Sequence, residues 1–252
     1  MQPGCFGAIV VSAILGATLF LVPGCGGKKP DKSGRKALAD EERFRRGYAN
    51  EEWRKGMDAI GKGNKDKALG HFARAAQFDP EDPAYPLAFG QLSLEMGDLE
   101  NAERALYAAM RTLEALQPED ATDAASHRRL RAEISLAAGD LLRERGHDSE
   151  AINAYRSATD ADPGMARAHY ELGHLFLRRQ AYSMAESRFR EALRVDPSML
   201  RAQAGLAVAY HLGGDSVRAW QEIQDIERKN YNVDKSLRES VLLAIQNQRQ
   251  SG

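Results

Sequence analysis

Two stretches of the chain carry residue types that bind nucleotides or zinc in other proteins. Residues 56–63 read Gly-Met-Asp-Ala-Ile-Gly-Lys-Gly, close to the glycine-rich loop that surrounds nucleotide phosphates. That loop needs Ser or Thr after its Lys to bind Mg²⁺, and Gly63 stands there instead. His169 and His174 are five residues apart, whereas two zinc ligands on one helix face stand about three or four apart. We therefore expect no metal and no cofactor.

No nucleophile stands in a recognisable catalytic pattern. The only cysteines are Cys5 and Cys25, and the chain has no Gly-x-Ser-x-Gly sequence. The net charge of −1 favours neither nucleic acid nor acidic lipid as a partner. We expect a protein that is not an enzyme and that takes neither nucleic acid nor a small-molecule substrate. An enzyme with a hidden site is the remote alternative, and it would need Asp, Glu or His clustered in a pocket.

A unit of 34 residues, present twice between residues 132 and 199, supplies the framework for these side chains. The first copy has six marker residues, which are Gly139, Gly146, Ala151, Tyr155, Ala158 and Pro163. The second copy repeats five of them 34 residues later, as Gly173, Ala185, Phe189, Ala192 and Pro197, with Gln180 in place of the second glycine.

Each marker has a physical reason. Glycine inside a helix costs about 1 kcal/mol relative to alanine, which is tolerable where another helix must approach closely. Gly139 and Gly173 therefore predict close helix contacts, and Tyr155 and Phe189 fill the space between the two helices of a unit. A proline ends each second helix because the residue before it avoids helical geometry.

The period and these markers resemble the tetratricopeptide repeat, a helix–turn–helix unit. Related markers upstream and downstream extend the resemblance to five repeats, at about 49–82, 83–131, 132–165, 166–199 and 200–233. A 15-residue insertion lies around residues 117–126, near Pro118, and lengthens the neighbouring helices. An apolar stripe after Asp234 predicts a capping helix over 234–250. The resemblance implies an all-α, right-handed superhelix over residues 36–250.

The first 25 residues form a separate segment. An apolar run at 6–22 precedes Val22-Pro23-Gly24-Cys25, which resembles the signal peptide of a bacterial lipoprotein. The resemblance implies removal of residues 1–24 and fatty acylation of Cys25, followed by a flexible tether to residue 35. Gly26, where an Asp would retain such a protein in the inner membrane, implies the outer membrane and the periplasm. An uncleaved anchor and a free Cys25 thiol remain as alternatives.

In the family it resembles, the first helix of each repeat lines a concave groove. The offsets assign to this groove Trp53, Met57, Ile60, Leu87, Gln91, Leu94, Leu136, Asp140, Arg143, Arg167, Tyr170, His174, Arg178, Arg201, Val208 and His211. The first half is apolar and the second carries Arg, His and Tyr, so a segment with an apolar stretch and an acidic end would complement it. The alternative is that residues 36–49 fold over the apolar half.

A lipoprotein built almost wholly of these repeats looks like the pilotins of type IV pilus systems. Pilotins bind subunits of the secretin, the outer-membrane channel, and help it to insert and assemble, so this function is an analogy of architecture. A scaffold for outer-membrane β-barrel insertion or for the cell-wall machinery is the alternative. The family's chaperone-binding members use Lys and Asn in the groove, and Trp53, Met57, Leu87 and Gln91 disfavour that role here.

Overall fold

The computed structural model describes residues 32–116, 121–229 and 235–250. The chain divides into two compact units, residues 1–41 and 42–252, and the second unit holds the helical array. The predicted signal peptide, the predicted lipidation site Cys25 and most of the predicted tether lie outside the described residues. The helix that begins the described chain starts at Lys32, so the last four residues of the predicted tether are helical, as the helix-compatible Lys and Arg types allow.

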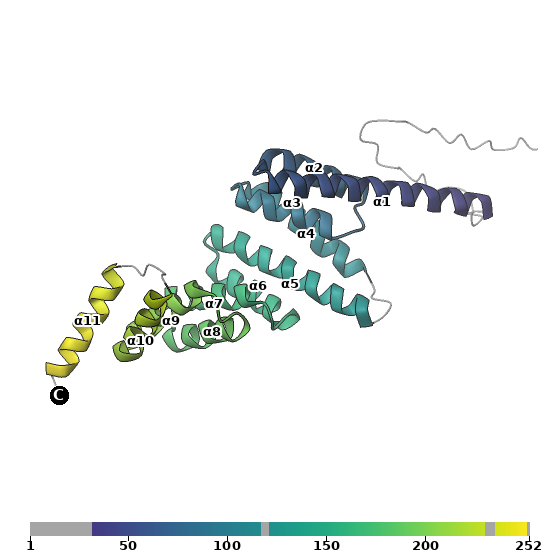
Figure 1. Cartoon of the computed structure of the whole chain (residues 1–252). Helices are drawn as coiled ribbons and strands as arrows, with labels where there is room; N and C mark the ends of the chain where they lie inside the picture. The colour runs from purple at the N-terminus through teal and green to yellow at the C-terminus, as the bar shows by residue number, and fades with distance from the viewer. Residues whose placement is uncertain (1–31, 117–120, 230–234, 251–252) are drawn as a thin grey trace, which may run out of the picture. The chain divides into compact units, whose positions relative to one another are not determined.

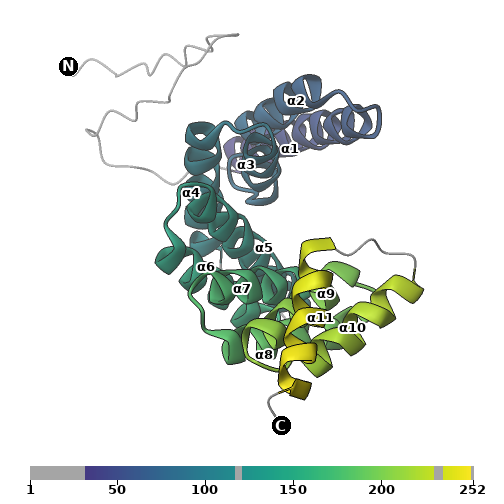
Figure 2. The ribbon, with the colours of Figure 1, turned by 90° about the vertical axis from the view of Figure 1, so that its left-hand side faces the viewer.

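All regular structure in the described ranges is α-helical, in five pairs followed by one more helix (Figures 1 and 2). The first helices of the pairs are α1 Lys32–Gly61, α3 Ala84–Glu95, α5 Ala121–Glu144, α7 Ala166–Arg178 and α9 Leu200–Leu212. The second helices are α2 Lys65–Phe78, α4 Leu99–Ala115, α6 Asp148–Ala161, α8 Tyr182–Val195 and α10 Ser216–Arg228. The last helix, α11, spans Lys235–Gln250 and packs on α10. The predicted fold class is confirmed.

Glycines of the first helices receive aromatic rings of the second helices. A Cβ added at Gly139 would lie 2.5 Å from the Tyr155 ring, and one added at Gly173 would lie 2.6 Å from the Phe189 ring. Real Cβ atoms do not approach so closely, so only glycine leaves room for the ring. In the fifth pair Ala207 replaces this glycine, and a smaller side chain, Ile223, replaces the ring.

The second marker glycine is needed for the turn between the two helices of a pair. Gly63, Gly97, Gly146 and Gly214 have φ between +71° and +94°, a region that side chains with a Cβ avoid. Gln180, which stands in the glycine position of the fourth pair, also has a positive φ, of +58°. The fourth pair therefore keeps the turn geometry although it has Gln180 in place of glycine.

The insertion lengthens mainly one helix. α5 has 24 residues, compared with 12 in α3 and 13 in α7. α4 has 17, compared with 14 in α2, and residues 117–120 lie outside the described part. Leu130, in the added turns of α5, is partly buried and packs against the core cluster that contains Leu87 of α3 and Leu113 of α4. The extra turns therefore belong to the packed array.

The two ends of the array are closed by different residue types. Lys55 and Asp58 of α1 are exposed, although the equivalent positions of α7, Leu172 and Leu175, are fully buried. A charged face of this kind suits an end that receives no preceding repeat. At the other end Val241 of α11 is fully buried. The identified core residues all lie between Ala49 and Ile245, so the chain from Lys32 onward holds its own core.

Glu52 of α1 is a buried carboxylate in the first pair. It accepts hydrogen bonds from Lys55 (2.9 Å) and Arg74, and it lies 2.9 Å from the ring nitrogen Nδ1 of His71. Burial raises the pKa of Glu52, but the hydrogen bonds from Arg74, His71 and Lys55 outweigh burial and lower it from 4.5 to about 2. A folded-state pKa below the unfolded value stabilises the protein above about pH 4.5, and this contribution is lost as pH falls toward 2.

We expect Glu52→Gln to lower the free energy of unfolding by about 1–3 kcal/mol at pH 7, because it removes the buried charge that pairs with Arg74 and Lys55. Denaturant unfolding at pH 7 and at pH 3 measures the effect, and the difference from the natural chain should shrink at the lower pH. Glu51→Gln is the control, since Glu51 is exposed and pairs only with Lys55. A Glu52 effect that does not shrink at pH 3 would show that the pKa is not depressed.

Candidate functional site

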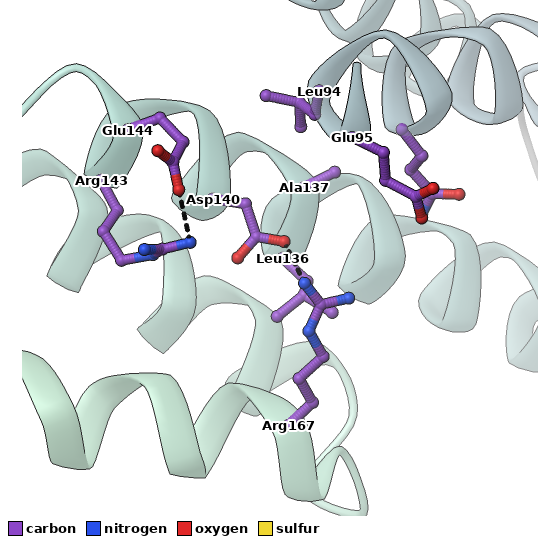
Figure 3. A pocket seen from close by; sticks show the side chains of 9 residues that line it. Leu94, Glu95, Leu136, Ala137, Asp140, Arg143, Glu144 and Arg167 are labelled. Atoms are coloured by element: carbon purple, nitrogen blue, oxygen red, sulfur yellow. Dashed lines mark hydrogen bonds and ion pairs between the residues drawn. The ribbon is translucent and has the colours of Figure 1, made fainter. Parts of the chain in front are cut away.

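The first helices of the second, third and fourth pairs line a cleft of about 310 Å³. Figure 3 shows side chains of α3, α5 and α7 converging on it. The lining residues are Gln91, Leu94, Glu95, Leu136, Ala137, Asp140, Arg143, Glu144 and Arg167. Six of these nine are predicted groove residues, so the structure brings this part of the predicted set together at one cleft.

One part of the cleft is apolar and another carries ion pairs. Leu94, Leu136 and Ala137 form the apolar part. Asp140 accepts hydrogen bonds from the Tyr155 hydroxyl (2.8 Å) and from Arg167 (2.6 Å). Tyr155 is fully buried, and its ring packs against Gly139. The core of the third pair therefore fixes the Asp140 carboxylate.

Arg143 extends the ionic part toward α7. Its guanidinium lies 2.8 Å from Glu144 and 3.8 Å from Glu171, and its buried Nε has no hydrogen-bond acceptor. Burial raises the pKa of Glu171, the neighbouring Asp140 carboxylate raises it further, and Arg143 opposes both effects. The ionic part therefore holds a buried guanidinium N–H that faces Glu171 without a close hydrogen bond.

Beyond Arg143 the groove surface becomes aromatic. The rings of Tyr170 and His174 are in edge contact, with centroids 4.6 Å apart, and the Arg201 guanidinium lies 4.9 Å from the Tyr170 centroid. Burial lowers the pKa of His174, and the charges of Arg143 and Arg201 lower it further, so the site favours the neutral imidazole. Arg178 is exposed and pairs with Asp148 at 3.1 Å.

The first half of the predicted groove is open at α1. Trp53, Met57 and Ile60 are 37%, 46% and 37% exposed. The alternative that residues 36–49 fold over them is wrong, because residues 42–49 continue into the same uninterrupted helix as the three side chains. These residues at spacings of four and three form one apolar stripe along α1.

Some groove assignments need correction. Leu87 is only 3% exposed and lies in the core with Leu106, so it is a packing residue. Leu136 borders the cleft, but it is only 8% exposed and also belongs to the main core. His211 has Ser216 and Ser240 at hydrogen-bond distance from its ring nitrogens, which ties it to α10 and α11.

Three cleft residues were not predicted, namely Glu95, Ala137 and Glu144. Each stands next to, or a turn of helix from, a predicted groove residue on the same helix, so a wider window around each offset would have found them. The sequence does not show which neighbour of each predicted groove residue faces the next helix pair. That depends on the angle at which the helices pack.

The two near-matches to chemical motifs have structural explanations. Gly56 lies in α1, where an added Cβ would be 2.4 Å from the Phe72 ring, and Gly63 makes the following turn. His169 is buried, with its Nε2 3.2 Å from the Pro163 carbonyl, whereas His174 contacts Tyr170 and Phe189. In the part of the chain that is described, no group of three or more His, Cys, Asp or Glu could hold a metal. No helix among those residues is long and apolar enough to cross a bilayer.

Comparison with known proteins gives matches at two levels. Residues 139–180 match a family described as TPR repeat, and residues 174–232 match one described as tetratricopeptide repeat. No curated protein sequence matches the chain. Together these matches run from the C-terminal end of α5 to just beyond α10.

Solved structures match over most of the chain. The protein pilF of Pseudomonas aeruginosa is 16% identical, with a TM-score of 0.63 over 82% of this chain and 93% of its own. A MamA structure is 17% identical, with a TM-score of 0.56 over 78% of this chain and 98% of its own. YrrB, described as a TPR protein with an unusual peptide-binding site, is 15% identical, with a TM-score of 0.55 over 83% of this chain and 97% of its own. At these identities the matches show a shared fold.

Proposed function

We propose that this tetratricopeptide-repeat chain is a scaffold that binds a segment of another protein along the groove of its first helices. The observation that carries the proposal is the cleft between α3, α5 and α7, together with the exposed apolar stripe of α1. A chain that keeps Trp53, Met57 and Ile60 exposed on one helix has a surface suited to an apolar partner.

The chemistry of the groove defines the kind of segment. Apolar side chains of the segment would lie against the α1 stripe and Leu94, and an acidic residue would lie near Arg143 and Arg201. Arg201 stacks on an aromatic ring, an arrangement that leaves the edge of its guanidinium available to a carboxylate. The gradient along the groove would set the direction in which the segment binds.

The finer proposal is that the protein is a lipid-anchored, periplasm-facing outer-membrane scaffold that acts as a pilotin on secretin subunits. The sequence around Cys25 supports the anchor. The shared fold of pilF supports the architecture at the level of analogy. A scaffold for β-barrel insertion or for the cell-wall machinery is the second candidate, because the groove would serve those partners equally well.

Photo-crosslinking in cells tests the groove. Gln91 lies in the cleft and is exposed, so a photoreactive residue can replace it without disturbing the core. Gln221 is the matched control, since it is an exposed glutamine on α10, outside the groove helices. We expect a specific protein adduct from position 91 that position 221 does not give, identified by mass spectrometry.

The identity of the adduct separates the alternatives. A secretin subunit captured from position 91 would support the pilotin proposal. A β-barrel insertion component or a cell-wall enzyme would replace the pathway and retain the scaffold. Equal capture from positions 91 and 221, or none from 91, would contradict binding in the groove.

A further inference from the structure

Exposed aromatic residues gather at the N-terminal edge of the array, away from the cleft residues. Phe44, Tyr48 and Phe78 are 63%, 43% and 36% exposed. Their rings form a chain, with centroids 4.5 Å apart between Phe44 and Tyr48 and 5.5 Å apart between Tyr48 and Phe78. We call these three residues the edge patch. Exposed aromatic side chains in mutual contact indicate a surface that is used.

Arginines and carboxylates both border the edge patch, since Arg45 and Arg46 line the hollow beside Phe78 together with Glu42, Asp79 and Glu81. Residues 43–48 read Arg-Phe-Arg-Arg-Gly-Tyr, so three cations alternate with two of the patch rings. Arg45 donates from Nε to the Phe78 carbonyl at 3.1 Å, and Arg46 has carboxylate oxygens of Asp79 and Glu81 only at 3.9 Å and 4.0 Å. Loose pairs of this length leave Arg46 available to an anionic surface.

The charge of this region differs from that of the rest of the chain. Residues 32–48 contain six Lys and Arg and three Asp and Glu, a net charge of +3, whereas the whole chain has a net charge of −1. The remainder of the chain is therefore acidic. A local excess of positive charge next to exposed aromatic rings is the composition of a segment that lies on an anionic bilayer.

A second exposed apolar surface continues the edge patch. Pro80 and Glu81 border both the small hollow beside Phe78 and a shallow trough on α4, lined by Tyr107, Ala108 and Leu116 among others. Tyr107 is 60% exposed and Leu116 is 42% exposed. The edge patch and this trough therefore adjoin at the α2–α3 loop, through Pro80 and the charged Glu81.

We propose that the edge patch and its arginines dock on a phospholipid surface. Phe44 and Tyr48 enter the interface between headgroups and acyl chains, and Arg45 and Arg46 contact the phosphates. Because the cleft residues are not part of this surface, the contact leaves the groove free for a partner.

A lipid surface fits better than a protein partner because of where the chain would be anchored. This part of the argument rests on the proposed acylation of Cys25. Phe44 follows Cys25 by 19 residues, of which those from Lys32 on are helical, so the chain between them reaches at most about 42 Å. An anchor so close raises the effective concentration of lipid at the edge patch, so a weak contact is enough to hold the array against the membrane.

Vesicle flotation of residues 32–252 tests the contact without the anchor, so its failure is distinguishable from failure of acylation or of groove binding. This part of the chain holds its own core. We expect it to bind vesicles of phosphatidylglycerol and phosphatidylethanolamine, and to bind less at higher salt, because screening weakens the arginine contacts. The double variant Phe44→Ser, Tyr48→Ser should weaken partitioning of the protein into vesicles by at least about tenfold.

Leu242→Ser with Leu243→Ser is the matched control, because these residues are 36% and 59% exposed on α11. Circular dichroism should show an unchanged helix content for both double variants. Equal loss of flotation in the two variants, or no flotation of the natural sequence, would overturn the proposal. Capture of a protein instead of lipid by a photoreactive residue at position 44 in cells would also overturn it.

Discussion

Replacing Phe189 with alanine is expected to lower the free energy of unfolding by about 3–5 kcal/mol, the usual range for a buried Phe. The side chain is fully buried in the main core, and two glycines on different helices face its ring. A Cβ added at either Gly173 of α7 or Gly205 of α9 would lie 2.6 Å from this ring. Gly173 and Gly205 have no side chains that could fill the cavity, so the fourth and fifth pairs lose the contact that this ring makes between them.

Thermal unfolding followed by circular dichroism measures the loss. For a chain of this size about 1 kcal/mol corresponds to about 2–4 °C, so the midpoint should fall by about 10 °C. Met184→Ala is the control, since Met184 is 43% exposed on the same helix. A change in Phe189→Ala no larger than that in the control would mean that the ring does not join the two pairs.

Gly173→Ala tests the same contact from the opposite side. In the natural chain the new methyl group meets the Phe189 ring, whereas in Phe189→Leu the smaller side chain leaves space for it. The destabilisation by Gly173→Ala should therefore be smaller when it is combined with Phe189→Leu, with a coupling of about 1 kcal/mol. Additive effects would show that the methyl group is accommodated by movement of the backbone.

The fold was predictable because each marker of the repeat has a local cause. Glycine is required where an aromatic ring packs against a helix and where a turn is left-handed. These requirements recur every 34 residues, so the pattern is visible in the sequence. Gln180 shows how far this holds, since its positive φ preserves the turn without glycine. The pattern therefore tolerated one missing marker.

The site was predictable only in part, because packing between repeats decides which side chains stay accessible. Leu87 holds a groove position by offset, yet it is buried in a core cluster that contains Ile134 and Ala137 of the long helix α5. The pair between Asp140 and Arg167 joins residues 27 apart on different helices, a contact that no periodicity specifies. Sequence offsets give the face of a helix, and the neighbouring helices decide its accessibility.

Cys25 decides whether this protein is held at a membrane by lipid, and its replacement is expected to abolish acylation completely. In the lipoproteins that the sequence resembles, a cysteine after a small residue is acylated and the segment before it is removed, so we expect loss of the Cys25 thiol to stop both steps. Two or more acyl chains on one residue give stable anchoring, whereas one chain gives marginal binding. Cells fed a labelled fatty acid should therefore yield a labelled natural chain that begins at Cys25, and an unlabelled, longer Cys25→Ala chain.

Cys5→Ala is the matched control, because Cys5 is the only other cysteine and lies within the predicted signal peptide. This variant should carry the label and begin at Cys25, like the natural chain. Membrane fractionation alone would be ambiguous, since the uncleaved apolar run at 6–22 can hold an unacylated precursor in the bilayer. Label on Cys25→Ala, or an N-terminus upstream of residue 25 in the natural chain, would contradict the lipid anchor. The groove could then still bind protein, but its proposed place at the outer membrane would lose its basis.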